Sequence, residues 1–231
     1  MNEPLYLALI GDMVASRHLS DRKATQEKLL MAICDLNDKP ELGSDALAAP
    51  LTLTAGDEVQ ALVRSPEAAV VLIQELTDRF GGAGKFPAFV FGLGLGPLST
   101  GPVHKSSEPP PNPALLDGPC FHNARRALEA AQKQGQWVLC EGFDSRVGLA
   151  LNAIFGLMGA IRSTWTGNQC LHTYHVRSYR FQKDWAGEFG VSPSVVSESL
   201  QAACFDEIKT GEIAAKSLLQ GVPLFNLEAS E

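Results

Sequence analysis

The first part of the chain carries short apolar runs separated by amphipathic stretches, a pattern typical of strands alternating with helices. Residues 5–10 form a nearly continuous apolar run, which predicts a central strand covered on both faces. After a loop at residues 11–19, Ser20 suits the N-cap of a helix whose apolar residues recur at spacings of three and four. We expect this helix to end near Asn37.

Two further strands are predicted around an acidic turn. Residues 51–53 and 59–63 flank the tripeptide Gly56-Asp57-Glu58, a pattern typical of a β-hairpin with an acidic tip. Pro66 suits the first turn of a second helix, because the amide hydrogen that proline lacks is not needed there, and residues 89–96 predict another strand. The order strand-helix-strand-strand-helix-strand is that of a ferredoxin-like sheet, so we expect an α+β fold.

The second part of the chain is predicted to be mostly helical. Residues 119–134 predict a helix, residues 137–140 a strand, and residues 147–161 a long, mostly apolar helix. This apolar run is shorter than the ~20 residues that a bilayer span needs, so a core or dimer helix is preferred to a membrane anchor. A connector at Gly167 leads to residues 182–204, which fit a helix-turn-helix.

Within the helix-turn-helix pattern, each part has a physical reason. Gly190 permits the turn, Ser192 caps the second helix, and Val196 and Leu200 face inward. We therefore expect three regions: an α+β domain at residues 1–142, a connecting helix and linker at residues 143–168, and an all-α helix-turn-helix domain at residues 169–231.

Composition narrows the class of protein. The chain has 231 residues, of which 45% are apolar, so it is long enough to bury a sizeable core. The formal net charge of -7 disfavours a general affinity for nucleic acid. Five scattered cysteines without a C-x-x-C pair argue against disulfides and structural zinc. No basic leader or long apolar segment is found, so we expect a cytoplasmic protein with no membrane partner.

Two aspartates at the edges of predicted strands are candidate metal ligands. Asp12 follows the first strand and Asp57 lies in the hairpin turn, each beside a glycine. Mg²⁺ prefers hard oxygen ligands and usually takes one or two carboxylates, leaving its other positions to water and phosphate. Glu58 is a possible third ligand or an exposed turn residue. The alternative is that both aspartates simply form turns, where Asp and Gly are common.

Three segments resemble class III nucleotide cyclases, in the same order along the chain. Residues 12–17 are similar to their D-I-x-G-x-T segment, and Gly56-Asp57-Glu58 resembles both their G-D hairpin and the core of a GGDEF turn. The spacing Gly118-x-x-x-His122-x-Ala124-x-Arg126 matches their G-x-x-V-N-x-A-x-R helix. This resemblance covers roughly residues 4–141. Over the whole chain, including Phe91-Gly92-Leu93-Gly94-Leu95-Gly96, Asp117-Gly118-Pro119 and the C-terminal region, the sequence resembles the SatD family, small bacterial proteins of poorly known function.

The cyclase resemblance implies roles for individual residues. Asp12 and Asp57 would bind Mg²⁺ or Mn²⁺, and Arg126 would meet the charge that develops on a transferred phosphoryl group, by analogy across a homodimer interface. His122 would donate to a phosphate, although a packed histidine is the alternative. The backbone amides that would hold the phosphates of a nucleoside triphosphate belong to Met13, Val14, Ala15 and Ser16, with Arg17 supplying positive charge.

The chain also departs from the purine-specific cyclases. The positions that read a purine base hold Leu53 and Leu115, and His122 replaces the asparagine that accompanies the arginine. An apolar wall at base-reading positions indicates a different nucleotide, a looser site, or a site without turnover.

The helix-turn-helix pattern predicts DNA contact, with a protein-interaction hairpin as the alternative. Ser194, Ser197 and Glu198 are the candidate base-reading residues, and Arg180 and Lys183 are candidate phosphate contacts. Two hypotheses follow. The chain is a nucleotide- and Mg²⁺-binding regulator that contacts DNA, or it is a metal-dependent enzyme that cyclises or hydrolyses a nucleoside triphosphate. The cyclase resemblance and the twofold symmetry of DNA half-site recognition both favour a homodimer.

Overall fold

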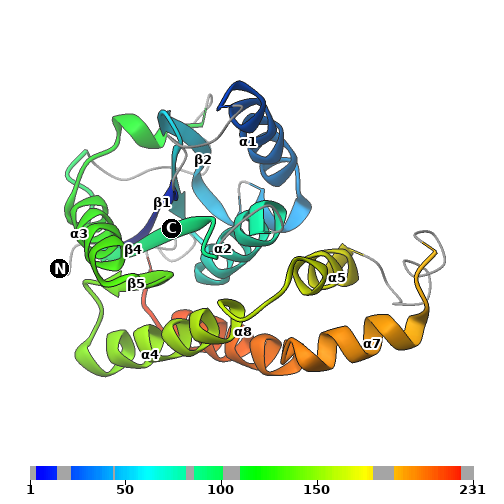
Figure 1. Ribbon diagram of the computed structural model, residues 1–231. Helices are drawn as coiled ribbons and strands as arrows, with labels where there is room; N and C mark the ends of the chain where they lie inside the picture. The colour runs from blue at the N-terminus through cyan, green and yellow to red at the C-terminus, as the bar shows by residue number, and fades with distance from the viewer. Residues whose placement is uncertain are drawn as a thin grey trace.

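The computed structural model describes residues 4–14, 22–43, 45–81, 86–100, 110–178 and 190–224. Their fold is α+β, with a mixed five-stranded sheet and seven α-helices in the described part of the chain (Figure 1). The strands are β1 (Tyr6–Met13), β2 (Leu47–Ala55), β3 (Glu58–Val63), β4 (Phe89–Gly96) and β5 (Val138–Glu141). The helices that flank the sheet are α1 (Arg22–Asn37), α2 (Pro66–Gly81) and α3 (Pro119–Gln134).

The sheet has the strand order β2-β3-β1-β4-β5. The pairs β2–β3, β3–β1 and β1–β4 are antiparallel, and β5 joins β4 in parallel. β1 is therefore the central strand, and its residues from Tyr6 to Gly11 are all buried. The prediction of a first strand covered on both faces is confirmed.

Helices cover the sheet on both sides (Figure 1). One apolar cluster joins the β1 residues Leu7 and Leu9 to α1 and α2, and a second joins Ala8 and Ile10 to α3. This division follows from the alternation of side chains along a strand. The same alternation places Asp12 on the α3 face of β1, two residues beyond Ile10.

Three alternating glycines allow α3 to pack unusually close to β4. A Cβ at Gly94 would lie 2.1 Å from the Ala124 nitrogen and from the Cys120 oxygen, and a Cβ at Gly92 would lie 2.0 Å from the Ala124 oxygen. These neighbours are backbone atoms, so they cannot move without displacing the helix. The glycine pattern of β4 thus fixes the height of α3 above the sheet.

Four more helices form a layer next to α2 (Figure 1). They are α4 (Ser145–Arg162), α5 (Gly167–Ser178), α7 (Pro193–Ala202) and α8 (Phe205–Gln220). Phe155 and Met158 of α4 and Ile208 and Leu219 of α8 belong to the same apolar cluster as α1 and α2. The core is therefore continuous from the sheet to α8, and the three predicted regions share it.

The element boundaries differ from the predictions at three places. β1 extends to Met13, so Asp12 lies inside a strand and not in a loop, because neighbouring strands pair with it on both sides. β2 begins at Leu47 rather than at residue 51. Gly167 begins α5 rather than a connector, since Thr166 and Gln169 form a reciprocal capping box: each backbone amide donates to the other residue's side-chain oxygen, at 2.7 and 3.3 Å.

The second helix of the helix-turn-helix pattern matches its prediction in part. α7 follows Ser192, and Val196 and Leu200 are buried as expected. Gly190 has a φ of 65°, which suits a glycine turn. Ser192 occupies the N-cap position, but its side chain does not cap the helix; its hydroxyl instead lies 2.6 Å from that of Ser194. The first helix of the pattern, residues 182–189, lies outside the described residues.

Two short 3-10 helices complete the described part of the fold. The 3-10 helix η2 (Pro40–Leu42) follows α1, and η3 (Pro113–Leu115) precedes α3; residues 101–109 lie outside the described part. In the described ranges, no helix combines the length and apolar character that crossing a membrane requires.

Candidate functional site

Three carboxylates meet where β1 ends and the β2–β3 hairpin turns. Asp12 of β1 lies opposite Glu58, the first residue of β3, and Asp57 precedes Glu58 in the two-residue turn. Gly56 adopts a φ of 66°, which lets the chain reverse tightly enough to deliver both acidic residues to this corner. We call Asp12, Asp57 and Glu58 the acidic cluster.

The electrostatics of the acidic cluster show that its members lie near one another. Burial raises the pKa of Asp12 above its ordinary value, and the negative charges of Asp57 and Glu58 raise it further. A hydrogen bond from Gln132 and the positive charge of Arg125 act in the opposite direction but do not outweigh these effects. Asp12 is therefore a member of the cluster whose ionised form is disfavoured by its surroundings.

Helix α3 supplies the protein's own partners for the cluster. Arg125 binds both carboxylate oxygens of Glu58, with its Nη2 2.8 Å from Oε1, and Gln132 Nε2 donates to Asp12 Oδ2 at 2.6 Å. Burial acts to raise the pKa of Glu58, but the hydrogen bonds from Arg125, Gln60 and Thr54 together lower it. Glu58 is thus ionised and already paired, which leaves Asp12 and Asp57 as the better candidates for a metal.

The structure brings Arg125, not Arg126, to the acidic cluster. Arg126 Nε donates to Glu141 Oε1 at 2.7 Å, and a second nitrogen of Arg126 donates to Asn123. His122 Nε2 lies 2.9 Å from Asp117 Oδ1 and is more than half exposed. In the sequence, the spacing from Gly118 pointed to Arg126 as the arginine of the site. Arg125 and Gln132, however, are seven residues apart and so lie on the same face of a helix. That grouping was the signal in the sequence that was missed.

The predicted phosphate-binding segment is described only at its start. Met13 is the last residue of β1 and pairs with Phe89. The amide of Val14 donates to the Ala88 oxygen at 2.9 Å, so this amide is engaged within the sheet. Ala15, Ser16 and Arg17 lie outside the described residues.

The two leucines at the base-reading positions lie in different environments. Leu53 of β2 packs against the main apolar cluster, so it contributes to the core. Leu115 of η3 is 78% exposed. Neither side chain can form the hydrogen bonds that would identify a purine.

Comparison with known proteins adds one finding. The family model of the SatD family matches residues 6–216. This chain belongs to the SatD family. No curated protein and no solved structure matches it.

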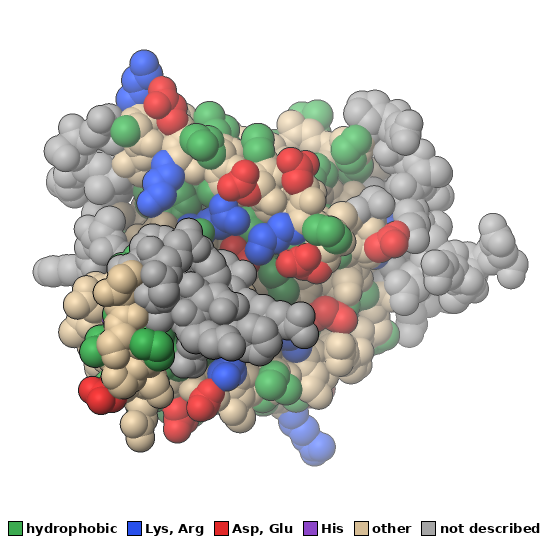
Figure 2. Space-filling view, turned by 90° about the vertical axis from the view of Figure 1, so that its right-hand side faces the viewer, with side chains coloured by type: hydrophobic (Ala, Val, Ile, Leu, Met, Phe, Trp, Pro, Cys, Tyr) green, Lys and Arg blue, Asp and Glu red, His purple; other side chains and the backbone are tan. Residues whose placement is uncertain are grey.

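In this SatD family chain, the candidate DNA contacts are only partly described. Ser194, Ser197 and Glu198 are exposed on α7, whereas Arg180 and Lys183 lie outside the described residues. Arg177, near the end of α5, is largely buried and pairs with Asp78 and Glu212. On the face shown in Figure 2, basic and acidic side chains are intermingled. The described part of that face has no continuous basic surface for a phosphate backbone.

The capacity of the SatD chain to hold a metal rests on two carboxylates. Within the described ranges, no group of three or more His, Cys, Asp or Glu side chains is arranged to hold a metal ion. Asp12 and Asp57 nevertheless offer the hard oxygen donors that suit Mg²⁺, which commonly completes its shell with water and substrate phosphates. The donor set therefore fits Mg²⁺ bound together with a phosphorylated ligand better than a closed structural metal site.

Proposed function

We propose that this SatD family chain binds a nucleotide together with Mg²⁺ or Mn²⁺ at the acidic cluster, and that occupancy regulates contacts made by the C-terminal helices. The observation that carries the proposal is the placement of Asp12 of β1 opposite Glu58 of β3, with Asp57 in the adjoining turn; burial and the charges of Asp57 and Glu58 raise the pKa of Asp12 there. A folded protein tolerates unneutralised carboxylates at one corner most readily where a cation normally shares the site.

The sheet supports the ferredoxin-like, cyclase-like part of the proposal. The order β2-β3-β1-β4 with antiparallel neighbours is the order expected for a ferredoxin-like sheet, and α1 and α2 pack on the same face. β5 and α3 are additions to that plan. In such a sheet, Asp12 and the hairpin carboxylates come from adjacent strands, which is the placement that the cyclase resemblance requires.

The chain's own residues would divide the work of binding. Asp12 and Asp57 would hold the metal ion, which when bound neutralises negative charge on phosphate oxygens. Arg125 would help to position the phosphates, since its guanidinium already lies at the cluster and Glu58 orients it through two hydrogen bonds. Gln132 would hold the Asp12 carboxylate in place.

Regulation needs a physical link between the site and the C-terminal helices. α2 contacts α5 and α8. Ion pairs also join α2 to α4 and α5, because Arg162 of α4 and Arg177 of α5 both bind the buried Asp78 of α2, at 2.6 and 2.9 Å. Arg177 also binds Glu212 of α8. A movement of α2 would therefore be transmitted to the helix layer that carries α7, the proposed DNA-contacting helix of a homodimer.

A metal-dependent enzyme that cyclises or hydrolyses a nucleoside triphosphate is the second candidate. The observation that favours it is the cation of Arg125 beside two carboxylates, because phosphoryl transfer depends mainly on positioning and on neutralising charge. The outward pairing of Arg126 and His122 within one chain favours the regulator.

Metal and nucleotide binding can be tested by calorimetry. The four ribonucleoside triphosphates are titrated into the protein with Mg²⁺, with Mn²⁺ and with a chelator, and the Asp57→Asn variant is compared with Glu27→Gln, an exposed carboxylate on α1. We expect metal-dependent binding that Asp57→Asn weakens at least tenfold and Glu27→Gln leaves unchanged. A triphosphate affinity that is the same with metal and with chelator, or no binding at all, would overturn the proposal. A product formed by the wild type and lost in Asp57→Asn would establish the enzyme.

The regulatory part needs a separate DNA test. Gel shifts with the upstream DNA of the protein's own gene are compared for the wild type, for Glu198→Lys on α7 and for Glu207→Lys on α8, both exposed positions. If α7 faces DNA, Glu198→Lys strengthens binding and steepens its salt dependence more than Glu207→Lys does. Equal effects, or no shift with any variant, would contradict DNA contact by α7.

A further inference from the structure

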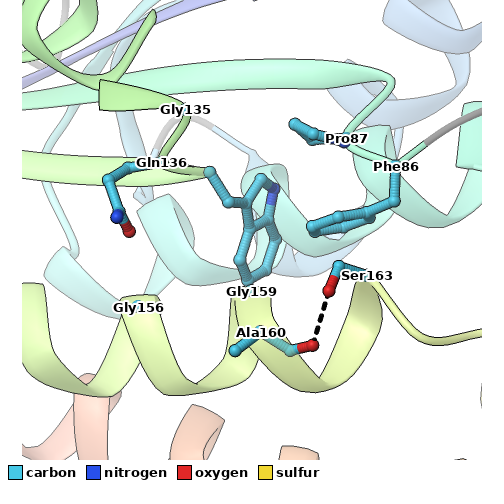
Figure 3. A pocket seen from close by; sticks show the side chains of 9 residues that line it. Phe86, Pro87, Gly135, Gln136, Gly156, Gly159, Ala160 and Ser163 are labelled. Atoms are coloured by element: carbon cyan, nitrogen blue, oxygen red, sulfur yellow. Dashed lines mark hydrogen bonds between the residues drawn. The ribbon is translucent and has the colours of Figure 1, made fainter. Parts of the chain in front are cut away.

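A cavity of about 230 Å³ opens between the start of β4, the end of α3 and helix α4 (Figure 3). It is lined by side chains from three separate segments: Phe86 and Pro87, Gln136 and Trp137, Ala160 and Ser163. Ligand sites that hold a whole small molecule usually exceed about 300 Å³. The cavity is therefore the right size for one ring system and leaves the rest of a larger ligand outside.

The cavity walls suit a flat, aromatic occupant. The rings of Phe86 and Trp137 lie 5.8 Å apart between centroids, with planes inclined at 58°. On the α4 side, Gly156 and Gly159 add no side chain to the cavity wall, and at Gly159 the helix packs closely on Trp137, where a Cβ would lie 3.3 Å from Trp137 Cβ. Aromatic side chains stack on any base because every base has a π-face.

Polar groups at the cavity rim can recognise the edge of such a ring. Gln136 extends toward α4, with its Oε1 3.6 Å from the position of a Cβ on Gly156, and the described part of the chain gives its amide no hydrogen-bond partner. The Ser163 hydroxyl donates to the Ala160 oxygen at 2.7 Å, which leaves its own oxygen free to accept (Figure 3). One amide with a donor and an acceptor, and one hydroxyl acceptor, match the edge of a nitrogen heterocycle.

The cavity lies at the same end of the sheet as the acidic cluster, on the face covered by α2 and α4, whereas Asp12 lies on the face covered by α3. Val14, which follows Asp12 by two residues, donates to Ala88, directly after the cavity residue Pro87. Gln132, which binds Asp12, precedes the cavity residue Gln136 by one helical turn. Two chain segments thus run from the cluster to the cavity.

We propose that this cavity is the nucleobase subsite of the nucleotide whose phosphates and metal bind at the acidic cluster. The inference rests on the proposed function for its link to phosphate, but the cavity itself binds the base without any metal. Contact with the partly exposed Phe86 supplies affinity, and Gln136 supplies the choice among bases.

The test uses unphosphorylated nucleosides in the absence of divalent metal, so that the acidic cluster contributes nothing. Adenosine, guanosine, cytidine and uridine are titrated into the full chain, and binding is followed by saturation-transfer NMR and by calorimetry. The cavity is filled with Ala160→Phe, and the matched control is Ala153→Phe, an exposed alanine on the same helix two turns earlier that does not line the cavity. Circular dichroism checks that both variants are folded.

We expect saturable binding of at least one nucleoside, weakened at least tenfold by Ala160→Phe and unchanged by Ala153→Phe. Gln136→Ala, which removes the amide from the cavity rim, should reduce the preference among the four nucleosides. No saturable binding to the wild type, or equal binding to both phenylalanine variants, would overturn the subsite. Asp57→Asn should leave nucleoside binding intact while it removes at least tenfold of the affinity that the metal adds to triphosphate binding, so failure of one proposal is distinguishable from failure of the other.

Discussion

Asp12 and Glu58 lie directly opposite each other in the antiparallel pair of β1 and β3. Like charges at opposite positions destabilise a sheet, yet here the hairpin adds a third carboxylate, Asp57. Arg125 and Gln132 of α3 compensate only in part, because the pKa of Asp12 remains raised by burial and by its acidic neighbours. A locally unfavourable arrangement of this kind is typical of a functional site, where stability is sacrificed for binding.

The first prediction is that Asp12→Asn stabilises the metal-free protein. Because the pKa of Asp12 is raised in the folded state, the folded protein holds this proton more tightly than the unfolded chain does, and its stability falls as pH rises above the ordinary carboxyl value of 3.8. Removing the charge should add about 0.5 kcal/mol to the free energy of unfolding at pH 7.

Urea unfolding at several pH values checks this prediction. The advantage of Asp12→Asn should shrink as pH approaches 4, and excess Mg²⁺ with triphosphate should stabilise the wild type but not the variant. A variant less stable than the wild type at pH 7 without metal would show that the carboxylate is not under repulsion.

The second prediction separates the two adjacent arginines. Arg125→Ala removes two hydrogen bonds from the largely buried Glu58 and should lower the free energy of unfolding by about 2 kcal/mol at pH 7. Arg126→Ala removes one exposed pair with Glu141 and should cost less than about 1 kcal/mol.

The stability that Glu58 contributes depends on pH, and the direction of that dependence follows from its lowered pKa. The pKa of Glu58 is lowered by its hydrogen-bond donors, so its stabilising contribution is present above the ordinary value of 4.5 and lost as pH falls through the lowered pKa. In Arg125→Ala most of that contribution disappears. If triphosphate affinity falls in Arg126→Ala and not in Arg125→Ala, the phosphate-binding role belongs to Arg126, as the cyclase resemblance implies.

The third prediction concerns the close packing of α3 on β4. Gly94→Ala places a Cβ against two backbone atoms at 2.1 Å, so the helix must shift, and the free energy of unfolding should fall by about 3 kcal/mol. Gly81→Ala, at the end of α2 with no atom within 4 Å of the new Cβ, should change stability by less than about 1 kcal/mol. Similar values for the two variants in thermal and urea unfolding would contradict this account of the glycine pattern.

The fourth prediction concerns the buried arginine between the two halves of the chain. Arg162 binds Asp78 at 2.6 Å and lies against the rings of Trp137 and Trp165, 5.1 and 4.7 Å from their centroids. Arg162→Leu leaves the Asp78 carboxylate buried with one partner fewer and should cost about 3 kcal/mol or more. Arg146→Leu, an exposed arginine in the first turn of the same helix, is the control and should be nearly neutral.

The number of unfolding transitions in the wild type and in Arg162→Leu tests what joins the C-terminal helices to the sheet. Because α4 and α8 share one apolar cluster with the sheet, the wild type is expected to unfold in one transition. If Arg162→Leu unfolds its C-terminal helices separately and leaves the sheet intact, the ion pair is what joins the two parts. If the variant matches the wild type in stability, the buried pair contributes nothing.

The sequence alone predicted most helices and strands correctly, because periodicity is a local property. The alternation in Phe89–Gly96 identified β4, Pro66 marked the start of α2, and the buried positions Val196 and Leu200 identified the inner face of α7. The acidic residues of the candidate site were also found from the sequence, since Asp12 and Asp57 each stand beside a glycine at a strand edge. The errors occurred where pairing overrode local preference, as in the extension of β1 through Asp12.

The tertiary structure alone decided which side chains meet at the site. Arg125 and Arg126 differ by one position, which is about 100° around a helix, and the helical repeat that groups Arg125 with Gln132 does not say which carboxylates that face meets. The contact of Arg125 with Glu58 spans 67 positions and that of Gln132 with Asp12 spans 120. Such contacts depend on how closely α3 approaches β4, which the glycines of β4 set through backbone packing. Sequence periodicity determines the elements, whereas the partners of each charge are determined by how the elements pack.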